Sequence, residues 1–313
     1  MDDEVALVLG GGGAAGNAWE IGIVAGLAEA GYDLTDAAGL VVGTSAGATA
    51  AVQVCSGIPP ATLLASVLSP PVRPGGRNLD PTAGLPMATV FERMRAIGAA
   101  ATSAADLQRA MGAFGLECDS ILEAGAEQRR ATVAARLPRQ DWPDRPMLIV
   151  ALDADTGELV AFDRAAGVDL VDAVTASTAL PGLAPTVSIN GARYIDGGVR
   201  SPDNADLAWG HARVVVLSPL GGRRRTPPEP GQFEGLRRPP EWGIDLESQI
   251  ERLRANGSQV EVITPDDASR AAMGTNQMDP ATRGPAARAG YDQGKREAGR
   301  LTDPQLRAQR GRD

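Results

Sequence analysis

The stretch Leu40-Val41-Val42-Gly43-Thr44-Ser45-Ala46-Gly47 joins a short apolar run to a small-residue segment through a GxSxG pentapeptide. The apolar run is typical of a buried strand, and the Ala-rich segment 46–54 is typical of a helix. A strand-to-helix turn of this composition exposes the serine at its tip, here Ser45, and the flanking Gly43 and Gly47 permit the sharp turn. The stretch therefore predicts a parallel α/β fold with a nucleophilic serine at the end of a strand.

The segments around this turn continue the alternation of strands and helices. An apolar run at 5–9 enters a glycine loop, and apolar positions at helical spacing follow across 17–30. Further strand patterns occur at 147–152, 159–162, 193–195, 214–217 and 260–263, and a helical pattern occurs at 168–179. Because this order is typical of a parallel sheet, we expect a mostly parallel central sheet with helices on its faces.

The remaining segments suggest how the chain is organised. Stretches rich in Pro, Gly and Arg at 69–86 and 221–243 are predicted loops. Helical patterns predict an insertion of about residues 87–136 that covers one edge of the sheet, as a lid or the side of a substrate groove, with helices at 87–100, 104–114 and 119–136. We expect one α/β domain over 1–275 and a polar, Arg-rich C-terminal tail at 276–313 that is helical or partly disordered.

Composition narrows the class of function. The 313 residues carry a formal charge of −9, which argues against a nucleic-acid binder and against strong attraction to an anionic membrane. Cys55 and Cys118 have no metal-ligand spacing and are expected in the core of a protein from a reducing compartment. The acidic N-terminus lacks a signal-peptide pattern, and no segment approaches the roughly 20 apolar residues of a membrane span. We expect a cytoplasmic protein with at most peripheral membrane contact.

The glycine loop at 11–16 has the form GxGxxG and two possible functions. It fits the dinucleotide-binding fingerprint, which also requires an acidic residue about 20 positions on, at the end of the second strand. That strand ends instead in Gly43-Thr44-Ser45, and Asp33 and Asp36 precede it. The alternative is an oxyanion hole, in which successive N–H groups at a helix N-terminus stabilise developing negative charge. The sequence favours the oxyanion hole.

Ser45 requires a base, and the chain contains a single histidine, His211. The order Ser45, Asp196, His211 is compatible with a triad, so a Ser-Asp-His esterase stays open as an alternative. Asp196-Gly197-Gly198 at the end of a predicted strand is the better candidate. Burial beside an apolar cleft raises the pKa of a carboxyl and makes it a stronger base toward a serine hydroxyl. We therefore expect a Ser45–Asp196 dyad.

Three elements, at 11–16, 43–47 and 196–198, occur in an order that resembles the patatin-like phospholipase family, whose members are lipid acyl hydrolases with a serine–aspartate dyad. Residues 7–27 also resemble the family's entry strand, loop and helix. Residues 176–182, followed by Pro185, resemble the segment that precedes the family's aspartate. The resemblance spans about residues 5–207 and implies the three-layer α/β/α patatin-like fold, with a mostly parallel central sheet and a helical insertion.

The resemblance also implies a role for each matching position. Ser45 corresponds to the nucleophile and Asp196 to the general base. Backbone amides of the first motif correspond to the oxyanion hole, at Gly11, Gly12, Gly13 and Ala14, and the other motif glycines are Gly16, Gly43, Gly47, Gly197 and Gly198. The implied substrate is a lipid or another acyl ester, and the implied chemistry needs neither a metal nor a cofactor.

One position departs from the family pattern. The family usually has Arg or Lys directly before the last glycine of the first motif, where this chain has Ala15. The backbone donors survive that change, but the charge assistance is lost. The departure supports a second hypothesis, a non-catalytic lipid-binding or regulatory protein that retains the fold. The apolar insertion at 87–136 fits a lipid substrate. The Arg223-Arg224-Arg225 cluster is either part of a solvated loop or a contact for phosphate head groups.

Overall fold

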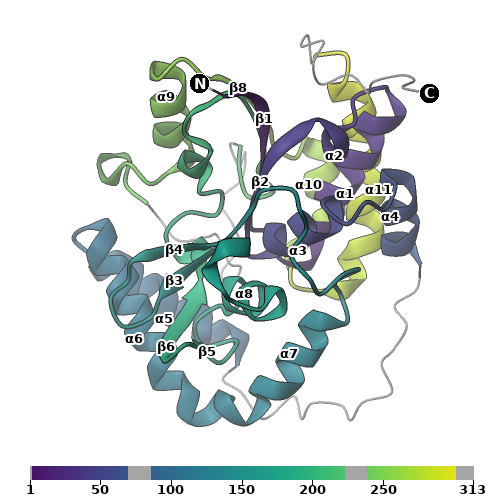
Figure 1. Ribbon diagram of the computed structural model, residues 1–313. Helices are drawn as coiled ribbons and strands as arrows, with labels where there is room; N and C mark the ends of the chain where they lie inside the picture. The colour runs from purple at the N-terminus through teal and green to yellow at the C-terminus, as the bar shows by residue number, and fades with distance from the viewer. Residues whose placement is uncertain (1, 70–85, 223–237, 301–313) are drawn as a thin grey trace.

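The computed structural model of the protein describes residues 2–69, 86–222 and 238–300. Its strands form one sheet in the order β5-β6-β3-β2-β1-β7-β8, and β4 pairs with β3 off this path (Figure 1). The parallel strands are β1 (Asp2–Leu9), β2 (Ala38–Thr44), β3 (Met147–Asp153), β7 (His211–Leu217) and β8 (Gln259–Ile263). The antiparallel ones are β4 (Leu159–Phe162), β5 (Val187–Ile189) and β6 (Ala192–Asp196). The prediction of a mostly parallel central sheet is confirmed.

Side chains alternate between the two faces of the sheet, and helices cover both faces. In β1, Val5, Leu7 and Leu9 enter one hydrophobic core, whereas Ala6 and Val8 enter a second. Helices around the first core are α1 (Gly13–Glu29), α2 (Leu34–Ala37), α3 (Ala46–Val54), α4 (Pro60–Leu68), α8 (Leu170–Ser177), α10 (Asp267–Met273) and α11 (Arg283–Glu297). The 3₁₀-helix η4 (Ala205–Ala208) and α9 (Leu246–Ala255) cover the second core. The predicted three-layer α/β/α arrangement is confirmed (Figure 1).

The helical insertion contains α5 (Met87–Ala100), α6 (Ala104–Leu122) and α7 (Ala126–Ala134). The predicted break between residues 114 and 119 was wrong, because α6 continues through it. Glycines there permit close packing: a Cβ on Gly112 would lie 2.0 Å from the carbonyl oxygen of Ala154. Although α6 has 19 residues, no described helix is both long and apolar enough to cross a membrane.

The C-terminal helix α11 packs closely against α1, although the two lie far apart in the sequence (Figure 1). A Cβ on Gly22 would lie 2.3 Å from the carbonyl oxygen of Ala287, and one on Gly26 would lie 2.1 Å from that of Tyr291. Through this contact Ala287 joins the first core. The C-terminal segment, predicted as a polar tail that is helical or partly disordered, therefore contains a helix that packs onto the α/β layers. Its composition did not indicate this packing.

Other predictions fall on residues that the structure does not describe. Residues 70–85 of the first predicted loop and 223–237 of the second lie outside the described ranges, as does the end of the tail from 301 to 313. The Arg223-Arg224-Arg225 cluster belongs to this group, so its predicted contact with head groups stays a prediction.

The helix contact can be tested at Gly26. Gly26→Ala is expected to lower the free energy of unfolding by about 1–3 kcal/mol, because the added methyl meets backbone that moves only if the helices separate. Gly98→Ala in α5 is the matched control, since no atom lies within 4 Å of a Cβ at that position. Alanine there gains up to ~1 kcal/mol of helix propensity. Urea unfolding measures both, and equal shifts would contradict the close approach.

Candidate active site

The candidate site lies where the parallel strands β1 and β2 end. Strand β1 pairs with β2 on one side and β7 on the other, which makes its carboxyl end the switch point where α/β proteins bind ligands. The register aligns Leu9 with Gly43, so the glycine loop after β1 and the serine turn after β2 lie side by side. A Cβ on Gly11 would lie 3.9 Å from Ser45 Oγ. The topology thus brings the first two sequence motifs together.

Ser45 occupies a strained backbone conformation. Its φ of 56° and ψ of −118° lie in a region that non-glycine residues rarely adopt. The Ser45 N–H donates to Ser177 Oγ over 2.9 Å. Two positions on, a Cβ on Gly47 would lie 2.0 Å from the carbonyl oxygen of Leu9, so this turn can approach β1 only with glycine there. Neighbouring contacts therefore hold the strained turn that exposes the serine.

Asp196 faces the serine from the end of β6. Thr44 pairs with Val150 of β3, and the next β3 residue, Ala151, pairs with Asp196, so the sheet register sets the spacing of the two motifs. Ser45 Oγ donates to Asp196 Oδ2 over 2.7 Å. The sheet register thus brings the second and third motifs close enough for a direct hydrogen bond between Ser45 and Asp196.

The environment of Asp196 suits a base. Its side chain is buried, and burial raises its pKa from 3.8 to about 6. Hydrogen bonds from the Ser45 hydroxyl and the Gly198 N–H, together with the charges of Arg129 and Arg238, lower the pKa and limit this rise. The Gly198 N–H donates to Oδ1 over 2.7 Å and leaves Oδ2 to the serine. A carboxyl with a pKa near 6 is ionised at neutral pH and a stronger base than an ordinary aspartate.

Two buried polar residues that the sequence did not identify hold this arrangement. Ser177 accepts the Ser45 N–H, as described above. Asn204 Nδ2 lies within hydrogen-bonding distance of Thr44 Oγ1 (3.1 Å) and the carbonyl oxygens of Gly197 (3.3 Å) and Ser201 (2.7 Å). Asn204 therefore links the strand before the serine to the loop after the aspartate. Ser177 lies in a segment that the family resemblance covers, whereas nothing in the sequence marks Asn204.

The glycine loop presents fewer donors than predicted. The Gly11 N–H donates to the carbonyl of Pro202 over 2.8 Å, so the prediction that Gly11 contributes to an oxyanion hole was wrong. The Ala15 N–H is likewise taken by Gln277 O, over 3.0 Å. Among the described residues, the N–H groups of Gly12, Gly13 and Ala14 donate no hydrogen bond to another backbone group. These three amides at the N-terminus of α1 remain available to an oxyanion.

Two buried carboxyl groups lie beneath the same loop. Burial and the charge of Asp203 raise the pKa of Glu20 well above its ordinary value, against a lowering by the Gly10 backbone. Burial raises the pKa of Asp203 to about 6, while the nearby Ser218 hydroxyl and the charge of Arg238 lower it. Burial therefore disfavours the charged forms of the two carboxyl groups beneath the loop that would receive an oxyanion.

His211 is far from the dyad. It begins β7 and lies in register with Asp2 at the start of β1, whereas the loop and the serine turn follow the other ends of these strands. A strand of this length spans about 20 Å. His211 Nδ1 lies 3.3 Å from the carbonyl oxygen of Ala208. The histidine does not reach the Ser45–Asp196 pair, which removes the geometric basis for a triad.

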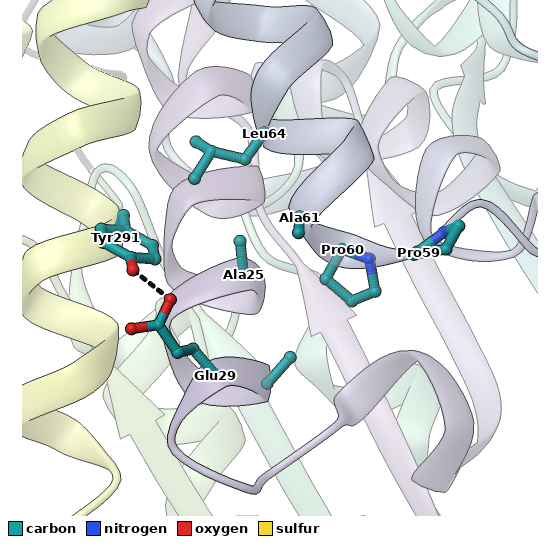
Figure 2. A pocket seen from close by; sticks show the side chains of 8 residues that line it. Ala25, Glu29, Pro59, Pro60, Ala61, Leu64 and Tyr291 are labelled. Carbon is teal, nitrogen blue, oxygen red and sulfur yellow. Dashed lines mark hydrogen bonds between the residues drawn. The ribbon is translucent and has the colours of Figure 1, made fainter.

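A cavity of about 450 Å³ lies away from the dyad. Figure 2 shows its lining, which includes Ala25, Glu29, Pro60, Leu64 and Tyr291, with the Tyr291 hydroxyl hydrogen-bonded to Glu29. The cavity opens at the carboxyl end of α1, about 20 Å along the helix from the glycine loop. It is therefore separate from the candidate site. Among the described side chains there is no cluster of three or more potential metal ligands.

These features define an α/β protein with a serine–aspartate pair at the carboxyl edge of a parallel sheet. The family model described as patatin-like phospholipase matches residues 7–209, which is more than half of the chain, so the protein belongs to this family. The resemblance inferred from the motifs is confirmed. Membership places the protein among lipid acyl hydrolases in general terms.

Two solved structures are similar to this chain. VipD from Legionella pneumophila is 14% identical, with a TM-score of 0.44, over 96% of this chain and 67% of that one. The type III effector protein ExoU is 19% identical, with a TM-score of 0.37, over 95% of this chain and 53% of that one. The chain thus spans about two thirds and about half of the lengths of these proteins. No curated protein matches it.

The raised pKa of Asp196 has a consequence for stability. The folded state holds this proton more tightly than the unfolded chain, so the stabilisation present below pH 3.8 is lost as the pH rises through about 6. Asp196→Asn is therefore expected to raise the free energy of unfolding at pH 8, by up to about 3 kcal/mol. The gain should shrink by more than half at pH 4.5. Urea unfolding at both pH values measures the difference, and a gain that does not change with pH would show that the pKa is not raised.

Proposed function

We propose that the protein is a serine hydrolase that cleaves acyl esters of lipids with a Ser45–Asp196 dyad. The observation that carries the proposal is the 2.7 Å hydrogen bond from Ser45 Oγ to the buried Asp196 Oδ2. This bond joins the serine of a strand-to-helix turn to a carboxylate whose pKa is about 6. A nucleophile in hydrogen-bond contact with an activated base is the arrangement that covalent catalysis requires.

In the acylation step, Ser45 Oγ attacks the carbonyl carbon of the ester while Asp196 takes its proton. The developing oxyanion accepts hydrogen bonds from the amides of Gly12, Gly13 and Ala14, whose N–H groups are available. Collapse of the tetrahedral intermediate breaks the bond to the alcohol, and protonated Asp196 gives its proton to that leaving oxygen. The product is an acyl ester of Ser45.

In the deacylation step, Asp196 accepts a proton from water as the water oxygen attacks the acyl-enzyme. The second intermediate is stabilised by the same amides, and Ser45 leaves with the proton that Asp196 returns. The fatty acid is released and the free dyad is restored. One carboxylate thus acts as base and then as acid in each half of the cycle, without a histidine, a metal or a cofactor.

A lipid substrate is supported by the family and by the surface beside the loop. Met278 is exposed, and a Cβ on Gly13 would lie 2.9 Å from its sulfur. An apolar side chain therefore borders the amides that would receive the oxyanion, as a lipid acyl group requires. The subtype proposed is a carboxylic-ester hydrolase of the phospholipase A, lysophospholipase or esterase kind, which contacts membranes peripherally at most.

A non-catalytic lipid-binding protein with the same fold is the second candidate, and Ala15 favours it. The dyad contact weighs against it, because a protein that only binds lipid has no need of a strained serine hydrogen-bonded to a buried carboxylate. Catalytic turnover separates the two candidates.

Substitutions at three positions test the dyad. Ser45→Ala and Asp196→Asn are each expected to lower kcat/KM for p-nitrophenyl butyrate by roughly 10⁴-fold, because the nucleophile or its base is lost. His211→Ala is the matched control and should change kcat/KM by less than about twofold. Circular dichroism confirms that each variant is folded. Retained hydrolysis in Ser45→Ala would refute the assignment, and a large loss in His211→Ala would restore the triad.

A further inference from the structure

The turn after Asp196 is held by an arginine from a distant part of the chain. Asp196 ends β6, and the residues that follow it form the 3₁₀-helix η3 (Gly197–Val199), which Arg200 caps. Arg238 lies 38 positions after Arg200 and outside residues 7–209, which the family model matches. Its contact with the turn is therefore a feature of this chain that lies beyond the matched region.

The guanidinium of Arg238 binds three successive carbonyl groups of this turn. Its Nε donates to the carbonyl oxygen of Arg200, and its Nη2 donates to those of Gly198 and Val199, the latter over 3.1 Å. The last carbonyls of a helix have no partners within the helix, and the donors of a guanidinium lie in a rigid planar fork. Arg238 therefore fixes the path of the backbone from Gly198 to Arg200.

The path of this backbone determines how the carboxylate of Asp196 is held. The carbonyl of Gly198 accepts from Arg238, while the N–H of the same glycine donates to Asp196 Oδ1 over 2.7 Å. The other carboxylate oxygen, Oδ2, accepts from Ser45 Oγ over 2.7 Å. A continuous series of contacts thus runs from Arg238 through Gly198 and Asp196 to the serine.

Asn204 and Arg238 share the carbonyl groups of this turn between them. Asn204 Nδ2 reaches those of Gly197 and Ser201, whereas Arg238 reaches the three that lie between. Each of the five carbonyls from 197 to 201 thus accepts from one of these two side chains. Hydrogen bonds from a charged donor are stronger than those from an amide. Arg238 therefore makes the larger contribution to holding the turn.

The charge of Arg238 acts on the same carboxylate that its contacts hold. The positive charges of Arg129 and Arg238 lower the pKa of Asp196 and oppose the rise that burial causes. Burial lowers the pKa of Arg238 itself to about 10, while Asp203 and Asp196 favour its charged form and Arg200 opposes it. Arg238 is therefore a cation at neutral pH, and it favours the ionised form in which Asp196 can accept a proton.

We propose that Arg238 is a positioning residue for the dyad: it holds the turn that orients the Asp196 carboxylate toward Ser45. The inference rests on the proposed function, because an oriented base serves catalysis only if Ser45 attacks an ester. Arg238 acts through Asp196 and takes no proton itself. A segment beyond the matched region thus completes the site that the three sequence motifs begin.

The first arm of the test measures hydrolysis of p-nitrophenyl butyrate as a function of pH. Arg238→Gln is expected to lower kcat/KM roughly 10- to 100-fold at pH 8, because a misplaced base transfers protons poorly. It should also move the midpoint of the acid limb upward from about 6, since a charge that favours ionised Asp196 is lost. Arg238→Lys keeps the charge without the fork of donors, so it should lower kcat/KM and leave the midpoint in place.

Arg254→Gln is the matched control for this arm. Arg254 Nη2 donates to the carbonyl oxygen of Val260 over 2.9 Å, in the edge strand β8, so the variant removes a guanidinium–carbonyl contact away from the dyad. It should change kcat/KM by less than about twofold at any pH. Circular dichroism confirms that each variant is folded. A loss in Arg238→Gln that is the same at every pH would show a merely structural role and overturn the proposal, as would no loss.

The second arm does not depend on turnover. The carboxyl carbons of aspartate-labelled protein are followed by NMR during a pH titration, and Asp196→Asn and Asp203→Asn assign the two signals, because burial raises the pKa of both groups to about 6. The Asp196 midpoint is expected to rise in Arg238→Gln and to stay unchanged in Arg254→Gln. A rise would show that Arg238 acts on Asp196 even if the protein hydrolyses no ester, which separates the inference from the proposed function. An unchanged Asp196 midpoint in Arg238→Gln would refute the proposal.

Discussion

The hydrogen bond from Ser45 Oγ to Asp196 Oδ2 is the interaction on which the rest of this site depends. Its two partners lie 151 positions apart in the chain and meet because the sheet register carries Thr44 to Val150 and Ala151 to Asp196. A serine in a relaxed turn would not present its hydroxyl to that carboxylate. The strain at Ser45 is therefore a structural requirement of the dyad, and Ser177 and Gly47 are the contacts that sustain it.

Burial gives the carboxylate a chemical property that an exposed aspartate lacks. Removing Asp196 from water raises its pKa to about 6, while hydrogen bonds and the charges of Arg129 and Arg238 limit the rise. A higher value would leave the group protonated at neutral pH, and an ordinary value would make it a poor base. The proposed acyl transfer therefore does not require a histidine, because burial makes the Asp196 carboxylate a stronger base.

The sequence predicted the fold well and predicted that Ser45 and Asp196 meet, because both depend on local patterns in a fixed order. Strand and helix periodicity indicated the α/β layers, and three short motifs identified Ser45 and Asp196. The sequence did not identify Asn204, whose role depends on contacts with residues distant in the chain. The same limit applies to Gly11, since Pro202, far along the chain, occupies its N–H. The sequence also did not predict the α1–α11 contact, because that contact depends on glycines of α1 that meet the backbone of a helix far along the chain.

We propose that Asp196 activates Ser45 without a histidine. This proposal can be tested by the rate at which a fluorophosphonate probe labels Ser45 as a function of pH, in the wild type, Asp196→Asn and His211→Ala. We expect labelling that rises with pH through about 6 in the wild type and in His211→Ala, and that is nearly absent in Asp196→Asn. Labelling that persists without Asp196, or that disappears with His211, would contradict it.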